Sequence, residues 1–176
     1  MKSSAYWKAV LMDRDNVLEG FLEAPQRTGI RYCLIGGTGV NSYAYPVVTE
    51  DLDIAVAAAD IDVLQTAMSQ RFRVRRFPHR INVSSPDSRL QIQIQTDERY
   101  FSLVDGAQLR EVLGLHLPVA RIEDVLQGKV WDAQDSTRRP SKQLKDLSDI
   151  ARLLEVSPDL RRLVPDEILA KIPKQT

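Results

Sequence analysis

The chain has 176 residues, and its 24 basic side chains balance 24 acidic ones. This balance does not mark a nucleic-acid-binding protein, and the length suits a single domain that buries a real core. No apolar run is long enough to cross a bilayer and no charged-then-apolar leader is present, so we expect a cytoplasmic protein with no membrane partner. Cys33 is the single cysteine, which excludes an intramolecular disulfide and predicts a buried core thiol.

The first part of the chain, residues 1–28, is expected to form helices. An apolar strand over 31–35 follows and ends at Gly36 and Gly37, which tolerate positive φ and let a ligand approach the backbone. A short helix over 38–43 would aim free N–H groups and the positive end of its dipole at a phosphate. The turn therefore predicts a phosphate cradle.

The next apolar strand carries two acids, Asp51 and Asp53. Successive strand side chains point to opposite faces, so both carboxylates share one face while the apolar residues between them turn toward a core. Neighbouring carboxylates repel each other unless a cation lies between them, and hard oxygen ligands favour Mg²⁺ or Mn²⁺ over zinc. Either motif alone is usually a plain turn or a solvated edge. Together and in this order they favour a site for a nucleoside triphosphate.

The remaining elements predict an α/β (α+β) fold, in which a mixed β-sheet flanked by helices fills 29–119 and a C-terminal helical cap fills 120–176. Asp60 is expected to cap a helix that reaches about residue 70. Strands are expected near 72–77, 80–85, 89–95 and, after a loop-rich stretch, 116–119. The later helices are expected over 122–134, over 141–154 and after Pro165.

Arginines gather on the predicted hairpin of residues 71–84: Arg71, Arg73, Arg75, Arg76 and Arg80. Because they alternate along the strands, they favour a solvated edge that deters sheet pairing. A contact with RNA is the alternative interpretation. A second basic group lies near residue 140: Arg138, Arg139, Lys142 and Lys145.

The glycine turn, its helix and Asp51-Leu52-Asp53 resemble the signature of the nucleotidyltransferase superfamily, with its DNA polymerase beta-like fold. Within it the chain most resembles the small AbiEii-like nucleotidyltransferases, where Thr-x-Asp-hydrophobic-Asp follows the glycine helix, as Thr49 to Asp53 does here. Residues 119–129 and 138–150 also fit that group, so the resemblance spans roughly residues 28 to 155.

The resemblance implies an enzyme that moves an NMP from an NTP to an acceptor hydroxyl with the help of Mg²⁺ or Mn²⁺. The implied nucleotide-binding residues are Gly36, Gly37, Thr38, Thr49, Lys129, Arg139 and Lys142. The implied catalytic residues are Asp51, Asp53 and Lys129, the first two as metal ligands, and Asp146 would orient Lys142. Thr49 would tether the strand or touch a phosphate. On general grounds a lone helical lysine such as Lys129 is solvated, and Lys142 pairs with Asp146 at i, i+4.

Two positions depart from the pattern: Val47 stands where relatives often carry arginine, and Gln93 aligns with a third acid. A glutamine oxygen is a weak metal ligand that brings no charge, so affinity for a second metal should fall. A catalytically weak or inactive relative that binds a nucleotide or a partner in the same cleft is therefore the alternative hypothesis. The acceptor stays open between a tRNA, a protein and a small molecule. The AbiEii-like resemblance also suggests a toxin paired with a cognate antitoxin.

Overall fold

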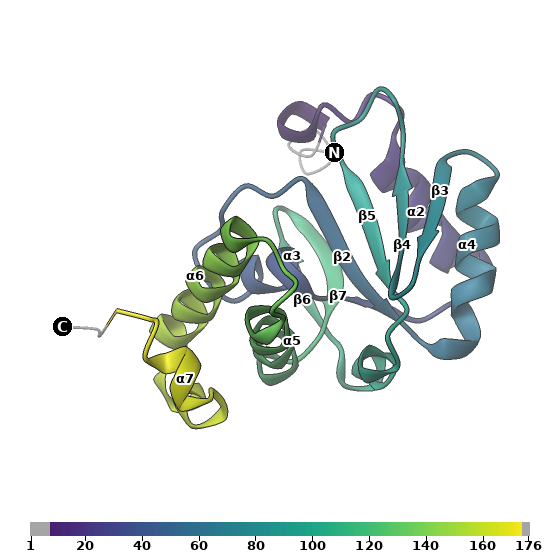
Figure 1. The fold of residues 1–176 in the computed structure, drawn as a ribbon. Coiled ribbons are helices and arrows are strands. Elements are labelled where there is room, and N and C mark those ends of the chain that lie inside the picture. Colours follow the sequence, from purple (N-terminus) through teal and green to yellow (C-terminus); the bar gives the residue numbers. More distant parts are fainter. Residues whose placement is uncertain (1–7, 174–176) are drawn as a thin grey trace.

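A computed structural model describes residues 8–173 and contains one seven-stranded mixed sheet with strand order β3-β4-β5-β2-β1-β7-β6 (Figure 1). The strands are β1 (Tyr32–Leu34), β2 (Asp51–Val56), β3 (Arg73–Phe77), β4 (Arg80–Ser84), β5 (Gln91–Gln95), β6 (Gln108–Val112) and β7 (Leu115–Val119). The helices are α2 (Val17–Thr28), α3 (Gly36–Asn41), α4 (Ile61–Ser69), α5 (Ile122–Gln134), α6 (Pro140–Val156) and α7 (Asp166–Leu169). Short 3₁₀ helices are η1 (Ala58–Asp60), η2 (Glu98–Gly106) and η3 (Pro158–Leu163).

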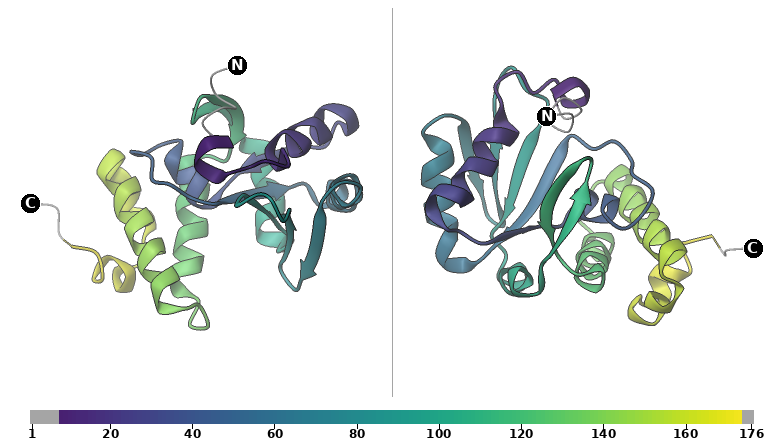
Figure 2. Two further views of the ribbon diagram at one scale, coloured as in Figure 1. Left: turned by 90° about the horizontal axis from the view of Figure 1, so that it is seen from above. Right: turned by 180° about the vertical axis from the view of Figure 1, so that it is seen from behind.

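The two halves of the sheet are covered from opposite sides. Helices α2 and α4 bury side chains such as Phe21 and Leu64 against the apolar face of β3, β4 and β5. Helices α5 and α6 pack a second core, which includes Leu126 and Ile150, beside β1 and β2 (Figures 1 and 2). The uncovered face of β4, β5 and β2 therefore looks toward α5 and α6, and polar side chains can gather there.

Parallel pairing of β2 with β5 decides which side chains share that uncovered face. Asp51 lies opposite Gln91, and Asp53 lies opposite Gln93. Leu52 alternates with the two aspartates and is fully buried. This alternation is the period of two that strand geometry imposes, so one strand supplies both core and site.

The predicted mixed α/β sheet with a C-terminal helical cap is confirmed, and the helix expected over 122–134 has these bounds. Helix α3 begins two residues earlier than the expected start at 38, so both glycines belong to its first turn. Strand β6 was not expected, because its hairpin turn consists of Leu113 and Gly114, both at positive φ. Leucine is rare in that conformation, and the usual Asn-Gly or Asp-Gly signal is missing.

Asp60 stands at the N-cap position of α4, but its side chain makes no capping bond there. Instead, its carboxylate accepts a hydrogen bond of 3.0 Å from the backbone N–H of Arg31, which ties the start of α4 to the sheet. The first seven residues of the expected N-terminal helical region lie outside the described residues. Among the described helices, none combines the length and apolarity needed to cross a bilayer.

Candidate active site

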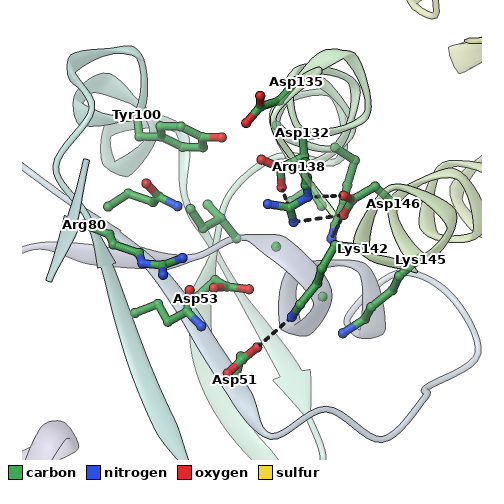
Figure 3. A pocket seen from close by; sticks show the side chains of 18 of the residues that line it. Asp51, Asp53, Arg80, Tyr100, Asp132, Asp135, Arg138, Lys142, Lys145 and Asp146 are labelled. Carbon is green, nitrogen blue, oxygen red and sulfur yellow. Dashed lines mark hydrogen bonds and ion pairs between the residues drawn. The ribbon is translucent and has the colours of Figure 1, made fainter. Parts of the chain in front are cut away.

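A cleft of about 680 Å³ separates the uncovered sheet face from α5 and α6 (Figure 3). Its carboxylates are Asp51, Asp53, Asp124, Asp132, Asp135 and Asp146. Its cationic side chains are Arg80, Lys129, Arg138, Arg139, Lys142 and Lys145. The aspartates of β2 lie on the sheet side, whereas the cations from Arg138 onward belong to α6 and the turn before it. The sheet side therefore presents Asp51 and Asp53, and the side formed by α5, α6 and the turn between them presents five cations among four further acids. From Arg138 onward this side carries four cations and one acid, and we call that part the basic wall.

Gly36 makes room for Asp53. The glycine has φ +57°, and a Cβ at this position would lie 2.7 Å from Cβ of Asp53 and overlap its carboxylate. The next contact also joins the two segments, since the backbone N–H of Ile35 donates to the carbonyl of Asp53 at 2.9 Å. The first turn of α3 thus lies directly against β2, and only glycine satisfies both the backbone angle and the space.

Asp53 is half-buried, and this environment changes its ionisation. Burial raises the pKa of Asp53 from 3.8 to about 6; the Lys129 ammonium lowers that pKa, and the Asp51 carboxylate raises it. Burial therefore destabilises the charged form of Asp53, and a cation bound by its carboxylate would stabilise that form.

Asp51 is held through its backbone and paired through its side chain. The Thr38 hydroxyl donates to the carbonyl of Asp51 at 3.0 Å, and the Thr49 hydroxyl accepts from its N–H at 3.3 Å. Thr38 is fully buried, so its hydroxyl fixes the start of β2 and does not face the cleft. Lys142 approaches the Asp51 carboxylate to 3.6 Å (Figure 3). Both threonines thus act as tethers of the strand.

Helix α6 supplies the basic wall. Lys142 pairs with Asp51, so the pair that we expected between Lys142 and Asp146 is not formed, because Asp146 is engaged elsewhere. Lys145 lies one turn further along, with Nζ 3.9 Å from where a Cβ of Gly37 would stand. Arg139 lines the mouth of the same cleft. Lys142 therefore faces Asp51, and Lys145 faces the glycine turn.

Lys129 lies at the back of the cleft with only 4% of its surface exposed. Its ammonium contacts Asp146 at 3.0 Å and Asp149 at 2.8 Å. Burial lowers the pKa of Lys129, but Asp149 and Asp146 outweigh burial, and the pKa is raised. Lys129 is therefore neither solvated nor free, and its nearest partners are the acids of α6.

Asp146 also accepts a hydrogen bond from Arg138: the Nε of Arg138 donates to the second carboxylate oxygen of Asp146 at 2.6 Å. Asp146 therefore orients Arg138 and Lys129, not Lys142 as expected. Arg138 in turn lies 3.3 Å from Asp132, a half-buried acid whose pKa is raised by burial, with Arg138 opposing the rise. The ion pairs join α5 to α6 and hold a guanidinium at the cleft surface.

Several cleft residues were not among the predicted site residues: Arg80, Tyr100, Asp132, Arg138 and Lys145. Arg138 and Lys145 belong to the second basic group of the sequence, and their closeness to Lys142 along the chain was the available signal. Arg80 was expected to be a solvated edge residue, and no local signal indicates that β4 carries it into the cleft. Tyr100 and Asp132 had no sequence signal, because η2 and α5 meet only in the folded chain.

The oxygen atoms of Asp51, Asp53 and Gln93 fit the ligand chemistry of a hard divalent cation. Within residues 8–173, no three side chains of His, Cys, Asp or Glu gather as a metal-binding group. Gln93 stands beside Asp53 where a third acid would complete such a group. The residues present thus fit Mg²⁺ or Mn²⁺ with two carboxylates and an amide, the remaining positions being left to water or substrate.

No protein-family model matches the sequence, and no curated protein matches it either. Solved structures do match. The solution structure of the antibiotic-resistance factor ANT(2'')-Ia aligns with 91% of this chain and 93% of its own, at a TM-score of 0.63 and 11% identity. A crystal structure of ANT(2'')-Ia in complex with adenylyl-2''-tobramycin gives a TM-score of 0.62 over 90% of this chain and 98% of its own, again at 11% identity.

An antigenic nucleotidyltransferase-like protein from Paracoccidioides brasiliensis aligns with 92% of this chain and 88% of its own, at a TM-score of 0.57 and 16% identity. These likenesses show that the chain has a nucleotidyltransferase-like fold. At sequence identities this low, the likeness supports a shared architecture and nothing more specific. The particular resemblance to AbiEii-like proteins stays a prediction.

Replacing Gly36 by alanine should destabilise the protein more than the same change at Gly29. Both glycines have positive φ, but nothing lies within 4 Å of a Cβ at Gly29. The left-handed backbone costs alanine about 1 to 2 kcal/mol at either position. Gly36→Ala adds about 1 to 3 kcal/mol by pushing Asp53 aside. Urea unfolding of the two variants tests this, and equal losses would contradict the close contact.

Replacing Lys129 by methionine should lower the free energy of unfolding by about 3 to 5 kcal/mol, because it leaves two buried carboxylates short of a partner. Lys145→Met is the matched control, since Lys145 forms no ion pair with a carboxylate of the described residues. Urea unfolding at neutral pH measures both. A Lys129→Met protein that is as stable as wild type but no longer binds nucleotide would instead favour a direct phosphate contact.

Asp53→Asn should stabilise the metal-free protein at neutral pH. The folded-state pKa of about 6 lies above the ordinary 3.8, so the folded state favours the protonated acid, and stability is lost as pH rises from about 4 through 6. Asparagine removes this cost, a gain of about 1 to 3 kcal/mol above pH 6 that vanishes near pH 4. Chemical unfolding in EDTA at both pH values tests it. Asp51→Asn should give a smaller gain, because the Asp51 carboxylate contributes less than burial to the raised pKa of Asp53 and because the substitution also removes the partner of Lys142.

Proposed function

We propose that the chain is a metal-dependent nucleotidyltransferase that moves an NMP from an NTP to an acceptor hydroxyl. The observation that carries the proposal is a single cleft in which Asp51 and Asp53 face Lys142 across the turn at Gly36 and Gly37. Such a cleft offers oxygen ligands for a cation and positive charge for phosphates within one side-chain length of each other. The nucleotidyltransferase-like fold supports this assignment.

In this mechanism the basic wall holds the triphosphate. Lys142, Lys145 and Arg139 neutralise its negative charge as point charges and as a guanidinium fork, while Gly37 leaves the backbone open to a phosphate oxygen. Asp51, Asp53 and Gln93 would hold Mg²⁺ or Mn²⁺, which supplies charge neutralisation at the phosphate oxygens. Catalysis then depends mainly on positioning and electrostatics.

Lys142 changes partner in this proposal. Its ammonium now lies 3.6 Å from the Asp51 carboxylate, with 38% of the lysine side chain exposed. A cation bound by Asp51 would repel the ammonium and free it to contact a phosphate. Arg138 keeps its place, because Asp146 and Asp132 hold it from two sides. Among the cations of the cleft, Lys142 is thus free to change partner, whereas Arg138 is fixed.

The role in the cell and the acceptor are the finer parts of the proposal. ANT(2'')-Ia has been crystallised with an adenylylated tobramycin, which supports a small-molecule hydroxyl as one acceptor class beside a tRNA or a protein. The AbiEii-like sequence pattern supports a toxin with a cognate antitoxin. Growth arrest on expression that requires Asp51 is the observation relevant to that role.

A catalytically weak or inactive relative is the second candidate. Gln93 favours it, because this residue pairs with Asp53 where a charged third ligand would stand. In that case the protein would bind a metal–nucleotide complex without releasing pyrophosphate, and Gln93→Asp would raise turnover by adding the missing charge.

The test combines calorimetric titration of the four ribonucleoside triphosphates, with Mg²⁺ or Mn²⁺, and pyrophosphate release in a cell extract that supplies acceptors. We expect Asp51→Asn and Asp53→Asn to lower turnover at least 100-fold, because each removes a charge at the reacting phosphate. Asp135→Asn, a cleft acid whose carboxylate is engaged by Thr137, is the matched control and should keep turnover. Retained turnover in both β2 variants would refute the assignment.

A further inference from the structure

The face of the sheet that carries the two aspartates continues to the edge strand β3. Strand pairing sets Arg75 opposite Asn82, Asn82 opposite Gln93, and Gln93 opposite Asp53. Directly paired residues project from the same face. Three strand spacings of about 4.8 Å put the edge about 14 Å from Asp53. One row of side chains thus leads from the sheet edge to the candidate active site.

The residues that share this face on β3, β4 and β5 are Arg73, Arg75, Phe77, Arg80, Asn82, Ser84, Gln91, Gln93 and Gln95. None of them is acidic, and the first two strands contribute three arginines. Arg73, Arg75 and Arg80 are exposed. Among the described residues these arginines form no ion pair with a carboxylate. We name this set the arginine–amide face.

The other arginines of the hairpin behave differently. Arg76 projects from the opposite face of β3 and reaches Gln65 at 3.0 Å and Asp62 at 3.5 Å. Arg71 pairs with Glu23 at 3.2 Å. Acids therefore neutralise the arginines on the helix-covered side, and only the side that leads to the cleft keeps free guanidinium groups.

The amides on this face also lack full partners. The side-chain oxygen of Asn82 is buried and accepts no hydrogen bond. Gln91, Gln93 and Gln95 line the cleft next to it, and each amide offers both a donor and an acceptor. Phe77 is 40% exposed, and the guanidinium of Arg80 lies 5.1 Å from its ring centre. The exposed ring of Phe77 offers a base a surface for stacking, with the Arg80 guanidinium beside it as a cation for the same base.

We propose that the arginine–amide face binds single-stranded RNA and that the terminal ribose hydroxyl of this RNA is the acceptor, an inference that rests on the proposed function. Free guanidiniums suit a phosphodiester backbone, the amides suit base edges and 2′-hydroxyls, and Phe77 suits a stacked base. An acidic protein segment would pair with the arginines, but its carboxylates would not provide both the donors and the acceptors that the row of amides can bind.

The step balances with the substrates named. The terminal RNA oxygen forms a bond to the α-phosphorus of an NTP, the bond between the α-phosphorus and the bridging oxygen breaks, and pyrophosphate leaves with the electron pair. The hydroxyl proton passes to solvent. The RNA becomes one nucleotide longer, and no oxidant or reductant is involved.

The test is fluorescence anisotropy with a labelled single-stranded RNA of about twelve nucleotides, within the footprint of such surfaces, without NTP or metal. Arg73→Gln/Arg75→Gln should weaken binding at least tenfold. It should also reduce the slope of log affinity against log salt by about 1.4, at about 0.7 for each lost contact on a single strand. Arg71→Gln/Arg76→Gln removes the same charge from paired positions and should change affinity less than twofold.

Equal losses in the two double variants, or no binding by the wild type, would overturn the proposal. Displacement of the RNA by poly-glutamate at similar concentration would assign the face to an acidic protein instead. A DNA strand of the same sequence should bind more weakly, because it lacks the 2′-hydroxyl, and equal affinity would overturn the choice of RNA. The readout contains no nucleotide, so RNA binding without transfer would refute only the proposed function, and transfer to another acceptor without RNA binding would refute only this inference.

Discussion

The buried ammonium of Lys129 is the interaction on which the cleft depends. It lies between two carboxylates of α6 and belongs to α5, so it joins the two helices that form one wall. Charges in such a place lose hydration, and they are tolerated only when each is paired. The extended set of pairs, which includes Arg138 and Arg152, meets that condition. A wall tied in this way holds Arg138 in place and gives the backbone of α6, which carries Lys142 and Lys145, a fixed position.

On the opposite wall, the pairing of the strands determines which side chains lie next to one another. Each strand of the uncovered face alternates a core residue with a polar one, and the register of β5 against β2 sets glutamines beside the aspartates. A shift by one residue would reverse both faces at once, so the apolar core selects the polar arrangement as well. The site is thus a by-product of the same packing that stabilises the sheet.

Local patterns were sufficient to predict part of this arrangement. Alternation predicted that Asp51 and Asp53 share a face, and the glycine pair predicted a special backbone at Gly36. The strand register sets Gln93 opposite Asp53, and its role as the counterpart of a third acid stays a prediction. These features depend on residues within one strand, one turn or one motif.

The rest depends on contacts between distant segments. Nothing near Lys129 in the sequence reveals that Asp146 and Asp149 would surround it, because α6 begins after a turn whose geometry the residues do not specify. Arg80 resembled an edge residue, since periodicity reports which residues alternate but not what faces them across a cleft. The exposed set on β3 becomes a continuous surface only when three strand registers are known.

The close contact between Gly36 and Asp53 limits the order in which the two residues can be replaced during evolution. Any larger residue at position 36 needs the volume that the carboxylate occupies, so a replacement escapes this clash, though not the cost of the left-handed backbone, only after Asp53 has become smaller. Drift at the glycine should therefore follow loss of the acid and seldom precede it. Among descendants of such a chain, an intact glycine beside an intact aspartate records continued selection on the pair. A lineage that has filled the space cannot regain the acid by a single substitution.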